Sequence, residues 1–118
     1  MSQSILIQTS LKFSAKIIKL QQFLIKEKKE TIISKQIIRS AISIGANINE
    51  ANYGSSKADF IAKMHIALKE TAETEYWIKL LNMSEYTDEK MYNSLLEDCL
   101  ELKRILVSSI NTAKANQK

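Results

Sequence analysis

The sequence predicts an all-α protein, an antiparallel up-down-up-down four-helix bundle. Proline is absent from the 118 residues and glycine occurs at two positions, Gly45 and Gly54, so the chain lacks the turn residues that all-β folds need in quantity. Its 45% hydrophobic and 25% charged residues match an average soluble domain, which argues against disorder. A chain of this length is typical of one domain, which we place at residues 1–118.

The first helix is predicted at about residues 10–29, because the preceding segment alternates at Ile5 and Ile7 and is too short to classify. Its apolar residues form two neighbouring stripes at helical spacing. The first stripe contains Phe13, Ile17, Leu20 and Leu24, and the second contains Leu11, Ile18 and Ile25. Together they are wider than the face that one partner helix usually covers. We therefore expect a neighbour beyond the core of the monomer.

The second helix is predicted at about residues 31–53. Steps of four and three residues connect Ile37, Ala41, Ile44, Ile48 and Ala51, a spacing typical of a coiled-coil-like seam. Gly45 lies beside this seam and leaves room for another backbone. Gly54 follows the last periodic residue, where a left-handed C-terminal cap is expected.

The third and fourth helices are predicted at about residues 57–83 and 88–112, followed by a polar tail. Ser56 and Asp59 form a capping box at the start of the third helix. Thr87, Asp88 and Glu89 supply an N-cap and first-turn acids for the fourth. The connections between helices are short, which favours antiparallel neighbours.

Basic residues concentrate in the N-terminal third. Residues 1–39 contain eight basic and two acidic residues, a net of +6, whereas residues 40–118 contain nine and eleven, a net of −2. The candidate phosphate-binding residues are Lys12, Lys16, Lys19, Lys26, Lys28, Lys29, Lys35 and Arg39. Four of them, Lys12, Lys16, Lys19 and Lys26, form a lysine stripe on one side of the first helix, and the other four are nearby in sequence. This lysine stripe is either the solvated face of a helix or a surface that binds the phosphate backbone of nucleic acid, with strong salt dependence. Phe23 is the aromatic residue beside it.

A second polar feature interrupts the apolar side of the third helix. Thr71, Thr74 and Glu75 project onto that side, and an unpaired buried carboxylate costs several kcal/mol. Asn49 on the second helix is the natural partner for Glu75. We interpret Asn49, Thr71 and Glu75 as a buried polar layer that fixes helix register; the alternative is the lining of an oligomer or a ligand pocket.

The sequence contains little that is typical of catalysis or metal binding. One histidine, His65, and one cysteine, Cys99, cannot form a zinc cluster, and two glycines cannot form a phosphate-binding loop. We therefore expect a non-enzymatic protein with no cofactor. No charge-free apolar run approaches the roughly 20 residues that span a bilayer, and no secretion signal is visible. These observations predict a cytoplasmic protein with no membrane partner.

Several long motifs resemble a known family. They are Arg39-Ser-Ala-Ile-Ser-Ile-Gly-Ala-Asn-Ile-Asn-Glu-Ala51, Ser56-Lys-Ala-Asp-Phe60, Ile66-Ala-Leu-Lys-Glu-Thr-Ala-Glu-Thr-Glu-Tyr-Trp77 and Leu95-Leu-Glu-Asp-Cys-Leu-Glu-Leu102. With them nearly the whole chain resembles the four-helix-bundle family of bacterial 23S ribosomal RNA intervening-sequence proteins. The chain departs from the commoner Asn-Ile-Ala-Glu-Gly pattern of that family at Asn47-Ile-Asn-Glu-Ala51.

The resemblance implies a ring-shaped homopentamer with no enzymatic activity. The family also resembles the accessory variability determinant of diversity-generating retroelements, a pentameric basic barrel that binds nucleic acid and a reverse transcriptase. The implied partners are further copies of the chain, nucleic acid, and another protein such as a reverse transcriptase. Two hypotheses follow: a nucleic-acid-binding oligomer, or a structural and protein-interaction scaffold. An enzyme or ligand binder that uses Glu75 and Asn49 is the third.

Overall fold

The computed structural model describes residues 2–54 and 56–116, which form four α-helices and no strand. The helices are α1 (Ser2–Lys28), α2 (Ile32–Ala51), α3 (Lys57–Met83) and α4 (Glu89–Ala115). Met1, Ser55 and the end of the predicted polar tail, residues 117–118, lie outside the described residues. The all-α prediction is confirmed for the part of the chain that is described.

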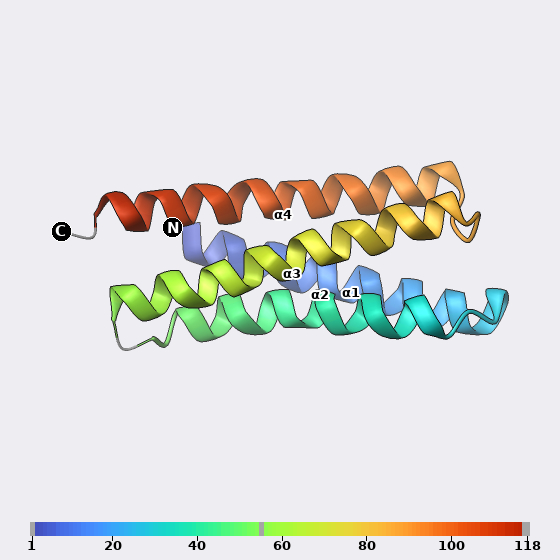
Figure 1. The fold of residues 1–118 in the computed structure, drawn as a ribbon, viewed down its shortest axis with the longest axis horizontal. Helices are drawn as coiled ribbons and strands as arrows, with labels where there is room; N and C mark the ends of the chain where they lie inside the picture. The colour runs from blue at the N-terminus through green and yellow to red at the C-terminus, as the bar shows by residue number, and fades with distance from the viewer. Residues whose placement is uncertain (1, 55, 117–118) are drawn as a thin grey trace.

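The helices run up and down in turn and form a bundle with extents of 50 × 21 × 19 Å (Figure 1). Each helix packs against the next one in the chain, and α4 returns to α1. The α1–α4 contact is the least extensive of the four. The α1–α2 and α3–α4 connections meet at one end of the bundle, which we call the paired-loop end, and both termini lie at the other (Figure 1).

The core follows the predicted apolar seams. Phe13, Ile17, Leu20 and Leu24 of α1 are buried, and so is every residue of the predicted α2 seam, Ile37, Ala41, Ile44, Ile48 and Ala51. Because residues three and four apart lie on the same side of a helix, each seam faces the inside of the bundle along its whole length.

Helix α1 begins at Ser2 and not near residue 10, so the predicted start is wrong. Leu6 and Ser10 are buried and extend the spacing of Phe13 and Ile17 backwards by steps of four and three. The Ser10 hydroxyl donates a 2.8 Å hydrogen bond to the Ile7 carbonyl oxygen. Because Ser10 is polar but occupies a core position, the apolar residues alone do not show the helical period in this segment.

A buried carboxylate begins α2. Glu30 accepts hydrogen bonds from the backbone N–H groups of Ile32 (3.0 Å), Ile33 (2.9 Å) and Ser34 (2.8 Å). The preceding residue, Lys29, adopts a left-handed conformation with φ of 55° and turns the chain out of α1. Glu30 therefore satisfies the free N–H groups of the first turn and places negative charge at the positive end of the helix dipole.

The expected left-handed cap at Gly54 is wrong, because neither glycine, both of which are described, has a positive φ. Gly54 instead leaves space: a Cβ atom there would lie 2.6 Å from the Asp59 carboxylate oxygen. Left-handed residues instead close α1 and α3. The Glu30 N–H after Lys29 donates to the Leu24 carbonyl oxygen at 2.9 Å, and the Tyr86 N–H after Glu85, which has a φ of 65°, donates to the Leu81 carbonyl oxygen at 2.9 Å.

Helices α3 and α4 begin with side-chain caps. The Ser56 hydroxyl accepts from the Asp59 N–H at 3.0 Å, which is one of the two hydrogen bonds of the predicted capping box. At the start of α4 the Asp88 carboxylate accepts from the Met91 N–H at 2.8 Å. Helix α3 therefore starts at the predicted residue, and α4 starts at Glu89, one residue after the predicted start, because Asp88 is its N-cap.

Candidate nucleic-acid interface

The structure divides the predicted basic residues into paired and unpaired groups. Lys16 lies 2.6 Å from the Asp98 carboxylate of α4 and also donates to the Ser94 hydroxyl. Arg39 pairs with Glu73 of α3 and lies 3.6 Å from Glu70. Both cations are thus neutralised inside the monomer and contribute less to an external anion site than the sequence pattern predicts.

Lys12 lies in a similarly acidic setting. It lines a groove between α1 and α4 together with Asp98 and Glu101. The N-terminal half of the lysine stripe therefore faces carboxylates across the α1–α4 boundary, which lowers its positive potential.

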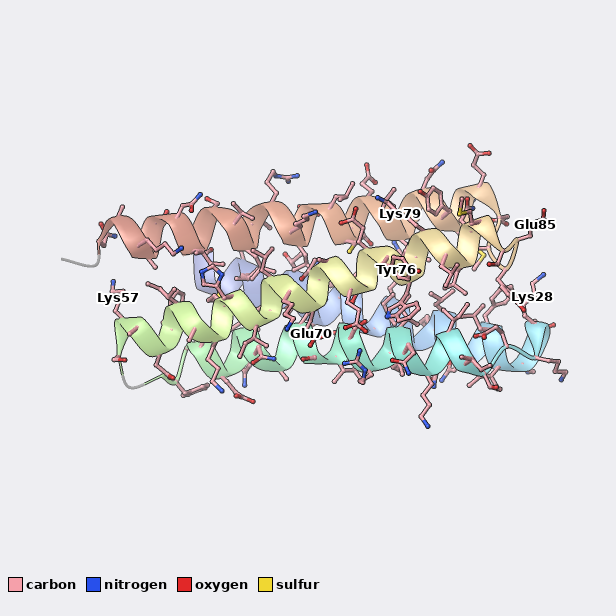
Figure 2. The ribbon with its side chains drawn as sticks, viewed as in Figure 1. Lys28, Lys57, Glu70, Tyr76, Lys79 and Glu85 are labelled. Atoms are coloured by element: carbon pink, nitrogen blue, oxygen red, sulfur yellow. The ribbon has the colours of Figure 1, made fainter. Side chains whose placement is uncertain are left out.

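The remaining five predicted lysines are exposed and make no ion pair within residues 2–54 and 56–116. They are Lys19, Lys26, Lys28, Lys29 and Lys35, and we call them the basic end. They lie on the last part of α1, the α1–α2 connection and the first turn of α2, near the paired-loop end. Figure 2 shows Lys28 at that end of the bundle, opposite the end that carries Lys57.

Acidic residues limit the basic end to the α1–α2 side. Glu85, Asp88 and Glu89 are exposed at the same end but belong to the α3–α4 connection and the start of α4. Within the basic end Glu27 is exposed, whereas the Glu30 carboxylate is turned inward to the N-terminus of α2. The positive surface is therefore compact.

A pocket of about 390 Å³ opens between α1 and α4 beside the basic end. Its lining residues are Lys16, Lys19, Leu20, Phe23, Lys90, Met91, Ser94 and Leu95. The Lys28 ammonium lies 5.8 Å from the centre of the Phe23 ring, within cation–π range. The site thus combines an apolar wall with several lysines.

The second apolar stripe of α1 remains uncovered in the monomer. Leu11, Ile18 and Ile25 are 40–58% exposed, and Ile42 of α2 is 50% exposed beside them. A groove of about 450 Å³ runs along this face, lined by Ile7, Ser10, Leu11, Ser14, Ile42, Gly45, Ala46 and Asn49. Contiguous apolar surface of this kind marks an interaction site.

The other side of the bundle carries a smaller apolar face on α4. Leu100 and Val107 are 40% and 39% exposed, and they flank Lys103, which bonds Glu75 of α3. Residues three and four apart share a face, so Leu100 and Val107 lie on the α3 side of α4. This places them across the bundle from the α1–α2 groove.

The predicted polar layer is partly wrong. Thr71 is buried, and Glu75 is 15% exposed, but Asn49 is exposed and lines the α1–α2 groove. Glu75 instead pairs with Lys79 at 2.9 Å and Lys103 at 3.1 Å. The hydrogen bond from Lys79, and then that from Lys103, holds the pKa of the Glu75 carboxyl below its usual range.

A different polar pair is buried inside the bundle. The Ser40 and Thr74 hydroxyls lie 2.8 Å apart and join α2 to α3. The Thr74 hydroxyl lies 2.8 Å from the Glu70 carbonyl oxygen and the Ser40 hydroxyl lies 3.2 Å from that of Ile37. Because each hydroxyl has one proton, one of the two donates to its own helix and the other donates across the pair. The sequence pattern places Thr74 on the buried side but gives no signal for Ser40, because serine is more often exposed than buried.

The two residues considered for chemistry are not brought together with other reactive groups. Cys99 is buried, which raises the pKa of its thiol to about 12, and His65 is exposed. In the described ranges no group of three or more His, Cys, Asp and Glu side chains is placed to hold a metal ion. Over the same ranges no helix has the length and apolar character needed to cross a bilayer.

Comparison with known proteins gives one family and a close structural relative. Residues 2–108 match the model of the 23S rRNA-intervening sequence protein family. A solved structure, described as a protein with unknown function from the S23 ribosomal protein family from Bacteroides thetaiotaomicron, is 47% identical with a TM-score of 0.92. That similarity covers 94% of this chain and 99% of the other. None of the curated proteins matches this chain.

Proposed function

Because the chain belongs to the family of 23S rRNA-intervening sequence proteins, we propose that it is a non-enzymatic, self-assembling four-helix bundle that binds the backbone of RNA or DNA. The observation that carries the proposal is the basic end: Lys19, Lys26, Lys28, Lys29 and Lys35 are exposed, close in the chain, and without an ion pair among the described residues. Exposed lysines without acidic partners are the groups that bind phosphates and release counterions.

The basic end contains five of the eight basic residues that the sequence predicts for the site. The other three, Lys16, Arg39 and Lys12, face carboxylates. The binding we propose is therefore directed to phosphates and weakly sequence-specific. It uses about five phosphate contacts per protomer.

Self-assembly is supported by the two uncovered apolar faces. The Leu11–Ile18–Ile25 stripe with Ile42 lies on the α1–α2 side, and Leu100 with Val107 lies across the bundle. Two different faces on opposite sides favour a head-to-tail contact, which closes into a ring when the rotation between neighbours permits. A homopentamer, as the family resemblance implies, has a mass of 5 × 13.4 = 67 kDa.

The proposed function is tested by a salt titration. Binding of a fluorescein-labelled single strand is measured by anisotropy between about 50 and 300 mM salt, and the oligomer mass by light scattering on a sizing column. Five phosphate contacts predict a slope of log K against log salt of about −3.5 for a single strand and about −4.5 for a duplex. Absence of binding at the lowest salt, or a slope near zero, overturns the nucleic-acid role.

A protein-interaction scaffold is the second candidate. The exposed apolar stripe on α1 and the internal pairing of Lys16 and Arg39 favour it. Under this function the purified oligomer carries no nucleic acid and keeps its mass at all salt concentrations.

A further inference from the structure

We infer that the pocket between α1 and α4 receives an unpaired base, so that the protein prefers single-stranded to duplex nucleic acid. The inference rests on the nucleic-acid binding proposed above and specifies that the site binds a single strand. The pocket volume of about 390 Å³ falls within the range of sites that hold small ring compounds.

The wall of the pocket is suited to the flat face of a base. Four of its lining residues are apolar: Leu20 and Leu95 are buried, and Phe23 and Met91 are half-buried. Bases stack on aromatic rings without regard to their identity, because each base has a π-face. The polarizable Met91 thioether packs well against aromatic surfaces.

Lysines stand around the opening of this apolar wall. Lys19 comes from α1 and Lys90 from α4, both are exposed, and both line the pocket. Lys16 lines it too but is held by Asp98. A base in the pocket would carry its flanking phosphates to Lys19 and Lys90, on the two helices that border the opening.

This combination distinguishes the two forms of nucleic acid. A duplex presents phosphates at higher density, one per about 1.7 Å of axis against 3.4 Å for each strand, so a purely electrostatic surface binds duplex at least as tightly as single strand. The bases of a duplex are stacked and paired inside it and do not enter a pocket. A single strand, in contrast, offers bases that can be turned out onto an aromatic side chain.

The test compares three labelled probes at one salt concentration: a 20-residue oligo-dT, a 20-base-pair duplex, and an abasic strand with the same number of phosphates. Each is titrated with the wild type and with Phe23→Leu, which keeps an apolar side chain in the pocket but removes the ring. Tyr76→Leu is the matched control, because Tyr76 is an exposed aromatic on α3, away from the α1–α4 pocket. Thermal unfolding verifies that each variant is folded.

We expect the wild type to bind oligo-dT about ten-fold more tightly than the abasic strand, and more tightly than the duplex. Phe23→Leu should abolish most of that advantage while the salt slope stays unchanged, and Tyr76→Leu should keep it. Equal, salt-dependent affinity for all three probes overturns the base pocket and leaves the proposed function standing. An equal loss on all probes in Phe23→Leu also overturns the pocket. No binding of any probe overturns both.

Discussion

Lys16 of α1 and Asp98 of α4 form an ion pair with 2.6 Å between the ammonium nitrogen and the carboxylate oxygen. Both side chains are 38% exposed, so solvent screens the pair and it contributes about 0–1 kcal/mol to stability. Its larger effect is on the surface, because it neutralises the middle of the lysine stripe and separates Lys12 from the basic end.

Replacing Asp98 with Asn should therefore strengthen nucleic-acid binding. The change frees Lys16, and the salt slope should steepen by about 0.7–0.9, the equivalent of one added phosphate contact. Glu97→Gln is the control. Glu97 is exposed on α4, and its substitution removes one negative charge without changing the ion pair of Lys16. If anisotropy titrations show the same increase in nucleic-acid affinity for both variants, the increase comes from the change in net charge and not from the release of Lys16.

Glu30→Ala should destabilise the bundle by about 1–2 kcal/mol, because it leaves three N–H groups at the start of α2 without their carboxylate partner. Urea unfolding followed by circular dichroism measures the loss. Glu27→Ala removes an exposed carboxylate from the preceding turn and should stay within about 0.5 kcal/mol of the wild type. A similar loss in both variants would contradict the capping role.

Glu75→Gln should lower the free energy of unfolding at neutral pH by about 1 kcal/mol, because Glu75 accepts bonds from Lys79 and Lys103. Its pKa is lowered by folding, so the unfolded chain binds the proton more tightly. This stabilisation is complete above the ordinary carboxyl pKa of 4.5 and is lost as the pH falls through the lower pKa of the folded state.

The difference between the wild type and Glu75→Gln should accordingly shrink on acidification, as urea titrations from pH 7 to about pH 3 can measure. A difference that persists unchanged at the acidic end would show that the Glu75 charge is not the stabilising element.

The helical spacing of apolar residues predicts most of the fold. The α2 seam from Ile37 to Ala51 is buried as its spacing predicts, and the resemblance to the intervening-sequence family is confirmed. One polar residue accounts for the wrong start of α1, because Ser10 occupies a core position there. A second polar residue, Glu30, binds the first N–H groups of α2, a role that the sequence pattern does not predict. Periodicity cannot reveal either, since their bonds depend on backbone geometry.

The candidate site is harder to predict from the sequence than the fold, because the acidic residues that pair with its basic residues lie on other helices. Nothing near Lys16 or Arg39 in the chain indicates Asp98 or Glu73 as their partner. Asn49 was misassigned for a related reason: a helical wheel shows that it borders the seam, but not that this border faces α1 and solvent, away from Glu75.

Ile18→Glu should dissociate the proposed oligomer without unfolding the protomer. Ile18 is 40% exposed in the monomer, so a carboxylate there remains hydrated when the chain is alone but is buried unpaired in an interface. Light scattering should show the mass fall toward 13.4 kDa while the helical circular dichroism signal is retained. Ser108→Glu, at an exposed position outside both apolar faces, should keep the oligomer; an unchanged mass for Ile18→Glu would place the interface elsewhere.

The most direct test of the basic end compares two triple variants in the same salt titration. Lys26→Gln, Lys28→Gln and Lys29→Gln together remove its centre, whereas Lys57→Gln, Lys69→Gln and Lys114→Gln remove exposed lysines from other parts of the bundle. Each triple lowers the net charge from +4 to +1. The first should flatten the slope for a single strand by about 2 and weaken binding at least about ten-fold, and the second should leave the slope unchanged. Equal losses in the two triples would contradict a localised site.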